Sequence, residues 1–184
     1  MNKIFFLAMI IALFTGCNDK ENNDVSDDNS GVVLERSVQE LEKIDGFVKS
    51  GLEFFFGSTR ESIENALGTP IKTKYEEHQN RHDPSKTDVI HELYYEGLYF
   101  QIYSVTEYNK DILLVVSLSN DAYPVQFGLN INSSRDKVRA VLGKPDTASD
   151  EMYRYFASEY VMGLVEFTFK GNNVTSIRWT FIPN

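Results

Sequence analysis

The sequence predicts an α+β protein built from two tandem units, each a short helix followed by an antiparallel meander of strands. Two observations lead to this prediction. A thirteen-residue segment occurs twice, as STRESIENALGTP at residues 58–70 and as SSRDKVRAVLGKP at residues 133–145. After each copy the chain continues with alternating apolar and polar residues, a pattern typical of strands with one buried face. We expect the two repeats to form one curved sheet with helices on one face, preceded by an N-terminal helix.

Residues 1–16 are expected to be a signal peptide. Lys3 supplies a positive start, an apolar run covers positions 4–14, and two small residues precede Cys17, the only cysteine of the chain. This run is too short for a membrane span, which needs roughly 20 apolar residues. The segment resembles a bacterial lipoprotein signal peptide, which implies acylation of Cys17, with palmitate as a typical chain. The alternative is an ordinary secretory signal with a cysteine near its end.

Residues 17–33 hold the lipidated cysteine and a tether in this interpretation. The segment after Cys17 is acidic, poor in apolar residues and rich in Asn and Ser. Such a stretch cannot bury enough apolar surface to offset the entropy lost on ordering, so we expect it to be disordered. Asn18, rather than an aspartate, follows the cysteine. By resemblance to the sorting pattern of enteric bacteria, this implies an outer-membrane address in a bacterial cell envelope.

The charge of the chain narrows the classes of partner. The formal net charge is −9, and it becomes −10 when the signal peptide takes Lys3 away. An acidic chain without a basic stripe argues against nucleic acid and against electrostatic docking on anionic lipid. With Cys17 acylated no disulfide can form, so stability must come from the core. The sequence implies no cofactor.

An extra helix is expected ahead of the first repeat, within residues 34–50. Apolar residues recur there on one side of a helix: Val38, Leu41, Ile44 and Val48. We expect this helix to pack on an edge or an end of the sheet. The first repeat then covers residues 51–121, and the second covers residues 122–184.

Each copy of the repeated segment carries the signals of a short helix. At the start, Ser58 with Glu61 forms the pattern of a capping box, and Ser133 with Asp136 forms a weaker version. Apolar residues follow at helical spacing, which are Ile63, Ala66 and Leu67 in the first copy and Val138, Val141 and Leu142 in the second. A glycine and, two residues later, a proline end both copies, which predicts the end of each helix.

The chain after each helix contains segments with a strand pattern, and after the first helix it also contains a polar stretch without one. In the first repeat a polar stretch at residues 72–88 is expected to be a solvated loop. Strands are expected at residues 89–97, 98–106 and 111–119 in the first repeat and at residues 151–158, 159–170 and 173–181 in the second. Alternation indicates the core side, because Leu98, Phe100 and Ile102 point one way and the residues between them point the other.

A capped helix that ends in L-G-x-P, followed by antiparallel strands and then repeated, resembles two related families. One has the tandem-repeat architecture of the beta-lactamase inhibitor protein (BLIP-like). The other comprises the small outer-membrane lipoproteins of the SmpA/OmlA (BamE) type, which carry one such unit. Gly57 precedes the first copy, whereas Asn132 takes that place before the second. The resemblance implies a protein-binding module without catalysis. Such a module binds its target on the exposed face of the sheet.

The one metal-like cluster in the sequence surrounds His78 and His82. Two histidines four residues apart share a face of a helix and can ligate zinc. The segment has no apolar stripe and a proline follows closely, so the competing interpretation is a solvated loop. We therefore predict no metal, with His78 and His82 as the candidates should one bind. His91 is expected to be a cross-strand polar residue.

Outward-facing tyrosines are the candidate binding residues. Tyr94, Tyr99 and Tyr103 alternate away from the apolar face of the first repeat, and Tyr153 and Tyr155 take corresponding strand positions in the second. Tyrosine gives contact area at little entropic cost and is enriched in binding patches. The alternative is that these rings pack against their neighbours on a half-buried sheet.

The sequence does not predict an enzyme. With Cys17 acylated no free cysteine remains, no G-x-S-x-G elbow occurs, and no glycine-rich phosphate loop follows a strand. We expect a membrane-anchored envelope lipoprotein that binds another envelope or secreted protein, in an assembly or scaffold role. The alternative is an inhibitor or immunity protein that blocks a secreted hydrolase.

Overall fold

The computed structural model describes residues 36–51, 56–80 and 82–182. The expected signal peptide, the lipidation of Cys17 and the tether at residues 17–33 lie outside these ranges. The described residues all fall in one compact unit. Within them, no helix has both the length and the apolar character needed to cross a bilayer.

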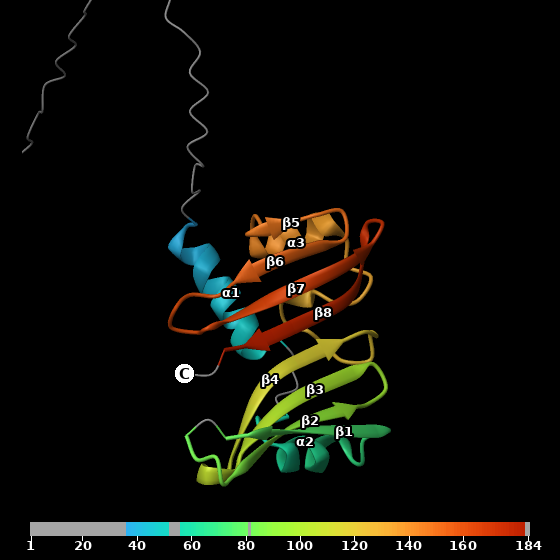
Figure 1. The fold of residues 1–184 in the computed structure, drawn as a ribbon. Helices are drawn as coiled ribbons and strands as arrows, with labels where there is room; N and C mark the ends of the chain where they lie inside the picture. Colours follow the sequence, from blue (N-terminus) through green and yellow to red (C-terminus); the bar gives the residue numbers. More distant parts are fainter. Residues whose placement is uncertain (1–35, 52–55, 81, 183–184) are drawn as a thin grey trace, which may run out of the picture. The chain divides into compact units, whose positions relative to one another are not determined.

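In its described part the chain has an α+β fold with three α-helices and one antiparallel sheet of eight strands (Figure 1). The α+β class is confirmed, whereas the sequence predicts only six of these strands. The helices are α1 (Val38–Ser50), α2 (Arg60–Leu67) and α3 (Arg135–Leu142), with 3-10 turns η1 (Thr106–Tyr108) and η2 (Gln126–Gly128). The strands are β1 (Lys72–Gln79), β2 (Thr87–Tyr94), β3 (Leu98–Val105), β4 (Lys110–Leu118), β5 (Thr147–Ala148), β6 (Met152–Phe156), β7 (Gly163–Lys170) and β8 (Asn173–Phe181).

The strand order is β1-β2-β3-β4-β8-β7-β6-β5. Strands β1 to β4 form one meander and strands β5 to β8 form another. The last strand of the first meander, β4, pairs with the last strand of the second, β8. At this seam Val116 lies opposite Trp179, and Leu118 lies opposite Ile177. Two groups of consecutive strands therefore join into one twisted sheet through a single antiparallel pair, β4 with β8 (Figure 1).

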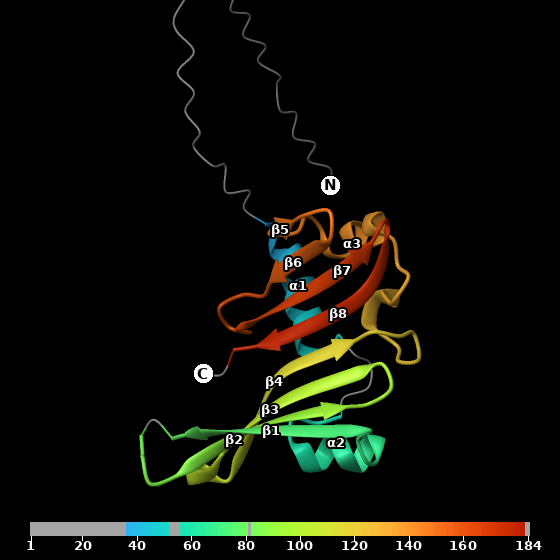
Figure 2. The same ribbon diagram turned by 45° about the vertical axis from the view of Figure 1, so that its right-hand side comes forward.

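The three helices cover the same face of the sheet (Figure 2). The ring of Phe47 in α1 lies 5.7 Å from the Trp179 ring of β8. The hydroxyl of Tyr95, just after β2, donates to the carbonyl of Gly68 at the end of α2. The hydroxyl of Tyr155 in β6 donates to the carbonyl of Gly143 at the end of α3. Each helix is thus attached to the side of the sheet that carries the core.

The core lies between the helices and this face of the sheet. Leu98, Phe100 and Ile102 of β3 are buried, whereas the residues between them are half-buried, so the predicted alternation is confirmed. The largest fully buried side chains come from both meanders and all three helices: Trp179, Tyr155, Phe47, Phe100, Phe167, Ile44, Ile63, Leu93, Ile102, Leu118, Leu129 and Leu142. The packing is one continuous cluster that spans the seam.

Both short helices end at a glycine in the same unusual conformation. Gly68 has φ 79° and ψ −162°, and Gly143 has φ 79° and ψ −160°. This region of backbone space is essentially open to glycine alone, because a Cβ would collide with the backbone. The predicted glycine stops are therefore confirmed, with the chain leaving each helix in an extended direction that leads to the following strand.

The start of each short helix lies one residue later than the sequence pattern predicts. Thr59 and Ser134 are the N-caps, and their side chains accept hydrogen bonds from the backbone N–H groups of Ser62 and Lys137. The prediction of Ser58 and Ser133 as caps is wrong. An N-cap must be the extended residue directly before the first helical one, and two adjacent hydroxyl residues satisfy the sequence signal equally well.

The polar segment predicted to be a solvated loop contains a strand. Residues 72–79 form β1, which pairs with β2 along its whole length. β1 is the edge of the sheet, and all but one of its residues are exposed. A strand exposed on both faces needs no apolar alternation, because backbone hydrogen bonds to one neighbour suffice to form it. The sequence pattern that marks half-buried strands is therefore absent.

Candidate functional site

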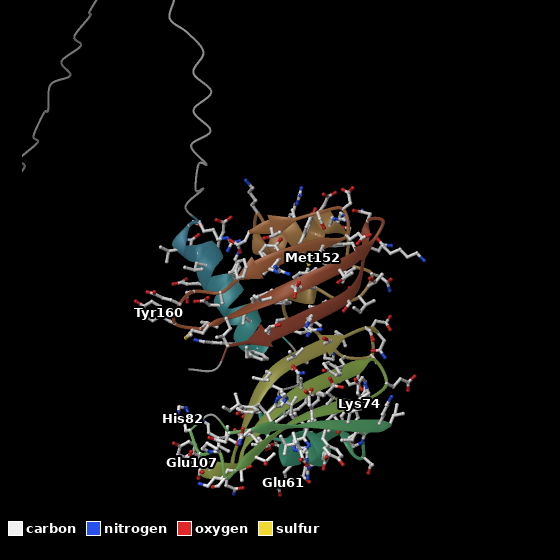
Figure 3. All side chains as sticks on the ribbon, in the orientation of Figure 1. Glu61, Lys74, His82, Glu107, Met152 and Tyr160 are labelled. Atoms are coloured by element: carbon white, nitrogen blue, oxygen red, sulfur yellow. The ribbon has the colours of Figure 1, made fainter. Side chains whose placement is uncertain are left out.

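The side of the sheet opposite the helices, here called the outer face, carries the candidate site. Its side chains alternate with the buried ones along β3, β7 and β8. In Figure 3, the labelled Lys74 of β1 and Met152 of β6 both lie on this face, one in each meander. The outer face therefore extends over strands from both meanders.

One row of outer-face residues crosses seven neighbouring strands in direct cross-strand register. Here called the outer row, it runs from Arg154 of β6 through Glu166, Arg178, Ser117, Tyr99 and Tyr94 to Lys72 of β1. Side chains directly opposite on neighbouring strands lie about 5 Å apart at Cβ and interact. The row thus brings charged and aromatic residues from distant parts of the chain into one line.

At the β1–β3 end of the outer row, the carboxylate of Glu92 organises the tyrosines. It accepts hydrogen bonds from the hydroxyl of Tyr94 at 2.6 Å and from the hydroxyl of Tyr99 at 3.2 Å. Lys74 lies 3.6 Å from the same carboxylate and 5.5 Å from the centre of the Tyr94 ring. The two tyrosine rings are 5.1 Å apart. Both rings are therefore held in fixed orientations.

The electrostatics of this group follow from its hydrogen bonds. The hydroxyl of Tyr94, and to a lesser degree that of Tyr99, lowers the pKa of Glu92 below its ordinary value. Partial burial, reinforced by the charge of Glu92, raises the pKa of Tyr99 to about 12. The two hydroxyl groups thus stabilise the ionised form of the Glu92 carboxylate.

At the β6–β8 end of the outer row, Glu166 lies between two arginines on the neighbouring strands. Its Oε1 lies 2.7 Å from Nη2 of Arg154, and both side chains are a third exposed or less. Arg178 is directly opposite Glu166 on β8. A shallow open depression at this end is lined by Ser117, Arg154, Leu164, Glu166, Thr168, Ser176, Arg178 and Thr180. The guanidinium groups are thus presented on a rigid sheet beside an accessible hollow.

Tyr103 has a different setting from Tyr94 and Tyr99. Its hydroxyl donates at 2.5 Å to the buried carboxylate of Asp88, which also accepts from the backbone N–H of Thr106 and from the side-chain amide of Asn80. These bonds, with that of Tyr103 the strongest, lower the pKa of Asp88. Asn80 in turn accepts from the two backbone N–H groups of residues 82 and 83. The network fixes the turn between β1 and β2.

The prediction that Tyr153 and Tyr155 face outward is wrong. Both are buried on the helix side, Tyr153 with its ring 4.7 Å from that of Phe169 and Tyr155 at 0 % exposure. Burial raises the pKa of Tyr155. The residues of β6 that face outward are the ones between, including Arg154. A shift of one residue in the assignment of a strand exchanges its two faces. The short β6, MYRYF, carries apolar or aromatic residues on both faces, so its pattern alone does not decide between them.

The histidines are not gathered into a metal site in the described residues. His78 is on strand β1 and His82 in the following turn, so they do not share a helix face. No group of three or more His, Cys, Asp or Glu side chains suited to a metal occurs among residues 36–51, 56–80 and 82–182. His91 lies on the helix side of β2, where burial and then the charge of Arg60 lower its pKa.

Arg154, Glu166 and Arg178 are among the residues of the site that the sequence did not single out. Each stands between two buried residues in a strand, as in "YRY", "VEF" and "IRW". This alternation was a usable signal, because a charged residue between two core residues must point to the opposite face. Their alignment in one row depends on strand order and register, and neither can be predicted from a local sequence pattern.

Comparison with known proteins gives one similar structure and no family. No protein-family model and no curated protein matches the chain. The fold is similar to a crystal structure of an extracellular protein containing a SCP domain from Bacillus anthracis strain Ames, with 12% identity and a TM-score of 0.42. The match covers 88% of this chain and 49% of that one, so the chain spans about half of its length. At this level the likeness carries no argument about function.

Proposed function

We propose that this protein is a lipid-anchored lipoprotein of the bacterial envelope that binds another envelope or secreted protein on the outer face, without catalysis. The observation that carries the proposal is the outer row, in which Tyr94, Tyr99, Arg154 and Arg178 lie in line on one sheet. Tyrosine and arginine are enriched among the few residues that dominate the binding energy of protein interfaces. Glu92 holds the two tyrosines and Glu166 holds Arg154, so these three side chains lose little freedom on binding.

The proposal includes descent of the two meanders from one repeated unit, α2 with β1–β4 and α3 with β5–β8. Their helices are equally long and stop at glycines with the same φ. Two residues before each N-cap the backbone also has positive φ, 80° at Gly57 and 73° at Asn132. Asparagine is among the few residues that tolerate this conformation, so the exchange preserves the geometry. These correspondences support a duplication, as in the tandem-repeat inhibitors that the sequence resembles.

The proposed anchor is the acylated Cys17, which lies outside the described residues. The 20 residues 18–37 would separate it from α1, long enough to let the outer face turn toward a partner. Metabolic labelling with a palmitate analogue, followed by membrane fractionation, tests the anchor. The chain should incorporate the label and sediment with membranes, and Cys17→Ser should do neither. Label on the Cys17→Ser variant would remove this part of the proposal.

Site-specific photocrosslinking in cells of the native host tests the binding face. A photoreactive phenylalanine analogue replaces Tyr99 in one variant and Arg178 in another. The matched control carries it at Tyr160, which is 87% exposed on the loop between β6 and β7 and away from the outer row (Figure 3). We expect both outer-row variants to crosslink to the same envelope or secreted protein, and the control not to.

The identity of the crosslinked protein distinguishes the roles. An envelope assembly component supports the scaffold role, whereas a soluble hydrolase that loses activity on binding supports the inhibitor or immunity role. Tyr99→Ala with Arg178→Ala should then weaken binding to the isolated partner by about a hundredfold, whereas Tyr160→Ala should leave it unchanged. Crosslinks that are the same at all three positions would contradict the proposal.

A further inference from the structure

The two edges of the sheet are unequal. At one edge β5 is only two residues long, whereas at the other β1 extends for eight residues (Figures 1 and 2). No strand of the described residues pairs with the far side of β1. A long open edge is a ready template for pairing with another strand. The open edge of β1 can therefore accept a strand from another chain.

The register of β1 with β2 shows which backbone groups of this edge are available. The N–H of Asn80 donates to the carbonyl of Lys86, in register with the rest of the ladder. Because hydrogen-bonded pairs alternate along antiparallel strands, the even-numbered residues of β1 bond to β2. The odd-numbered residues from Thr73 to Gln79 therefore turn their N–H and C=O groups toward the open side.

We propose that β1 pairs with β1 of a second copy of this chain, antiparallel and with Tyr75 opposite Tyr75. A two-fold axis perpendicular to the sheet would relate the copies, which keeps both outer faces on the same side. The odd-numbered residues would supply the hydrogen bonds, with Thr73 opposite Glu77 of the other copy. This pairing uses only backbone groups of β1 to which no other strand of the described residues bonds.

The charges of β1 select this register. With Tyr75 on the axis, Lys74 of each copy lies opposite Glu76 of the other, and Lys72 lies opposite His78. Shifting the axis to Lys74 places two lysines opposite each other, and shifting it to Glu76 does the same with two glutamates. Opposite charges in direct cross-strand pairs stabilise a sheet, and like charges destabilise it. Only the register centred on Tyr75 is free of a like-charge pair among the three.

The alternation of charge also distinguishes this edge from a protected one. Edges that prevent pairing carry charges that repel an approaching strand. On β1 the lysines precede the midpoint and the glutamates follow it, so a reversed copy is complementary in charge. Tyr75 at the midpoint is 71% exposed, and a second Tyr75 would cover it. The outer faces of the two copies would thereby join into one continuous surface.

Disulfide trapping tests the register directly, in the full chain with Cys17→Ser purified in mild detergent. Residues in a hydrogen-bonded antiparallel pair have Cα atoms about 5.5 Å apart, within reach of a disulfide. Tyr75→Cys should therefore give a covalent dimer on mild oxidation. Thr73→Cys is the matched control, because the two copies of residue 73 would lie about 14 Å apart along the strands. Equal crosslinking of both variants, or of neither, overturns the proposal.

Charge reversal tests the pairing in solution by sedimentation over a wide range of concentration. Glu76→Lys would place lysines opposite Lys74 twice and should weaken the dimer about tenfold or more. Glu77→Lys makes the same change in net charge on the other face, opposite Thr73, and should leave dimerisation nearly unchanged. Thermal unfolding checks that both variants are folded. A monomer at every concentration, or equal effects of the two reversals, contradicts pairing through β1.

Discussion

The indole N–H of Trp179 donates a hydrogen bond of 3.1 Å to the backbone carbonyl of Phe47. Phe47 lies in the last turn of α1, where carbonyl groups lack partners within the helix. A strand near the end of the chain thus completes the first helix. Gly51 allows the approach, because a Cβ at that position would be 2.6 Å from Nε1 of Trp179 and 2.3 Å from the Phe47 carbonyl oxygen.

Gly51→Ala and Gly46→Ala should therefore have opposite effects on the free energy of unfolding. In Gly51→Ala the added methyl group displaces the indole and leaves a buried carbonyl without its partner, at a cost of about 1–3 kcal/mol. At Gly46, within α1, an added Cβ meets nothing within 4 Å. Gly46→Ala should stabilise by about 0.5–1 kcal/mol through helix propensity. Urea unfolding measures both, and destabilisation of equal size would contradict the role of the indole.

The attachment of α1 to the second meander depends on Asp45. Its carboxylate accepts two hydrogen bonds from Ser158, from the backbone N–H at 2.7 Å and from the hydroxyl at 2.6 Å. Asp45→Ala should lower the free energy of unfolding by about 1–3 kcal/mol and accelerate amide hydrogen exchange in α1. The control Glu42→Ala removes the same charge from an exposed position of the same helix and should change exchange little.

His91 should make the stability depend on pH in the mildly acidic range. Its pKa is lower in the folded chain than the ordinary value of 6.5, mainly because it is partly buried. The unfolded chain therefore binds a proton more readily, and the free energy of unfolding falls as pH drops below about 6.5. Above about pH 6.5 His91 is neutral in both states, so it lowers the free energy of unfolding only at more acidic pH. His91→Gln should flatten the profile between about pH 7 and pH 5, as followed by urea unfolding, and an unchanged slope would assign the dependence elsewhere.

The glycines that end α2 and α3 offer a matched pair of substitutions. Alanine at either position must adopt a backbone conformation that is essentially restricted to glycine, which costs about 1–3 kcal/mol. At Gly68 nothing lies within 4 Å of the added Cβ, whereas at Gly143 it meets the Glu40 carboxylate at 2.7 Å. Glu40 also accepts from the N-cap of α1. Gly143→Ala should therefore be the more destabilising variant in thermal unfolding, and the reverse order would contradict this reading.

Features that depend on neighbouring residues along the chain could be predicted from the sequence. The α+β class, the glycine stops of α2 and α3 and the buried face of β3 all follow from spacing and from the conformational limits of single residues. The outward position of Tyr99 follows in the same way, since alternation over the long β3 leaves one choice. These predictions needed no knowledge of which strands are neighbours.

Other features were decided by tertiary structure. β1 exists because β2 offers it a ladder of hydrogen bonds, and none of its own side chains marks it as a strand. The weak alternation of β6 left Tyr153 and Tyr155 assigned to the wrong face until packing against α3 placed them in the core. The outer row depends on the pairing of β4 with β8, which aligns Tyr99 with Arg178. Sequence patterns record what one residue imposes on the next few, whereas register between distant strands arises from hydrogen bonds and packing between segments that meet only in the folded chain.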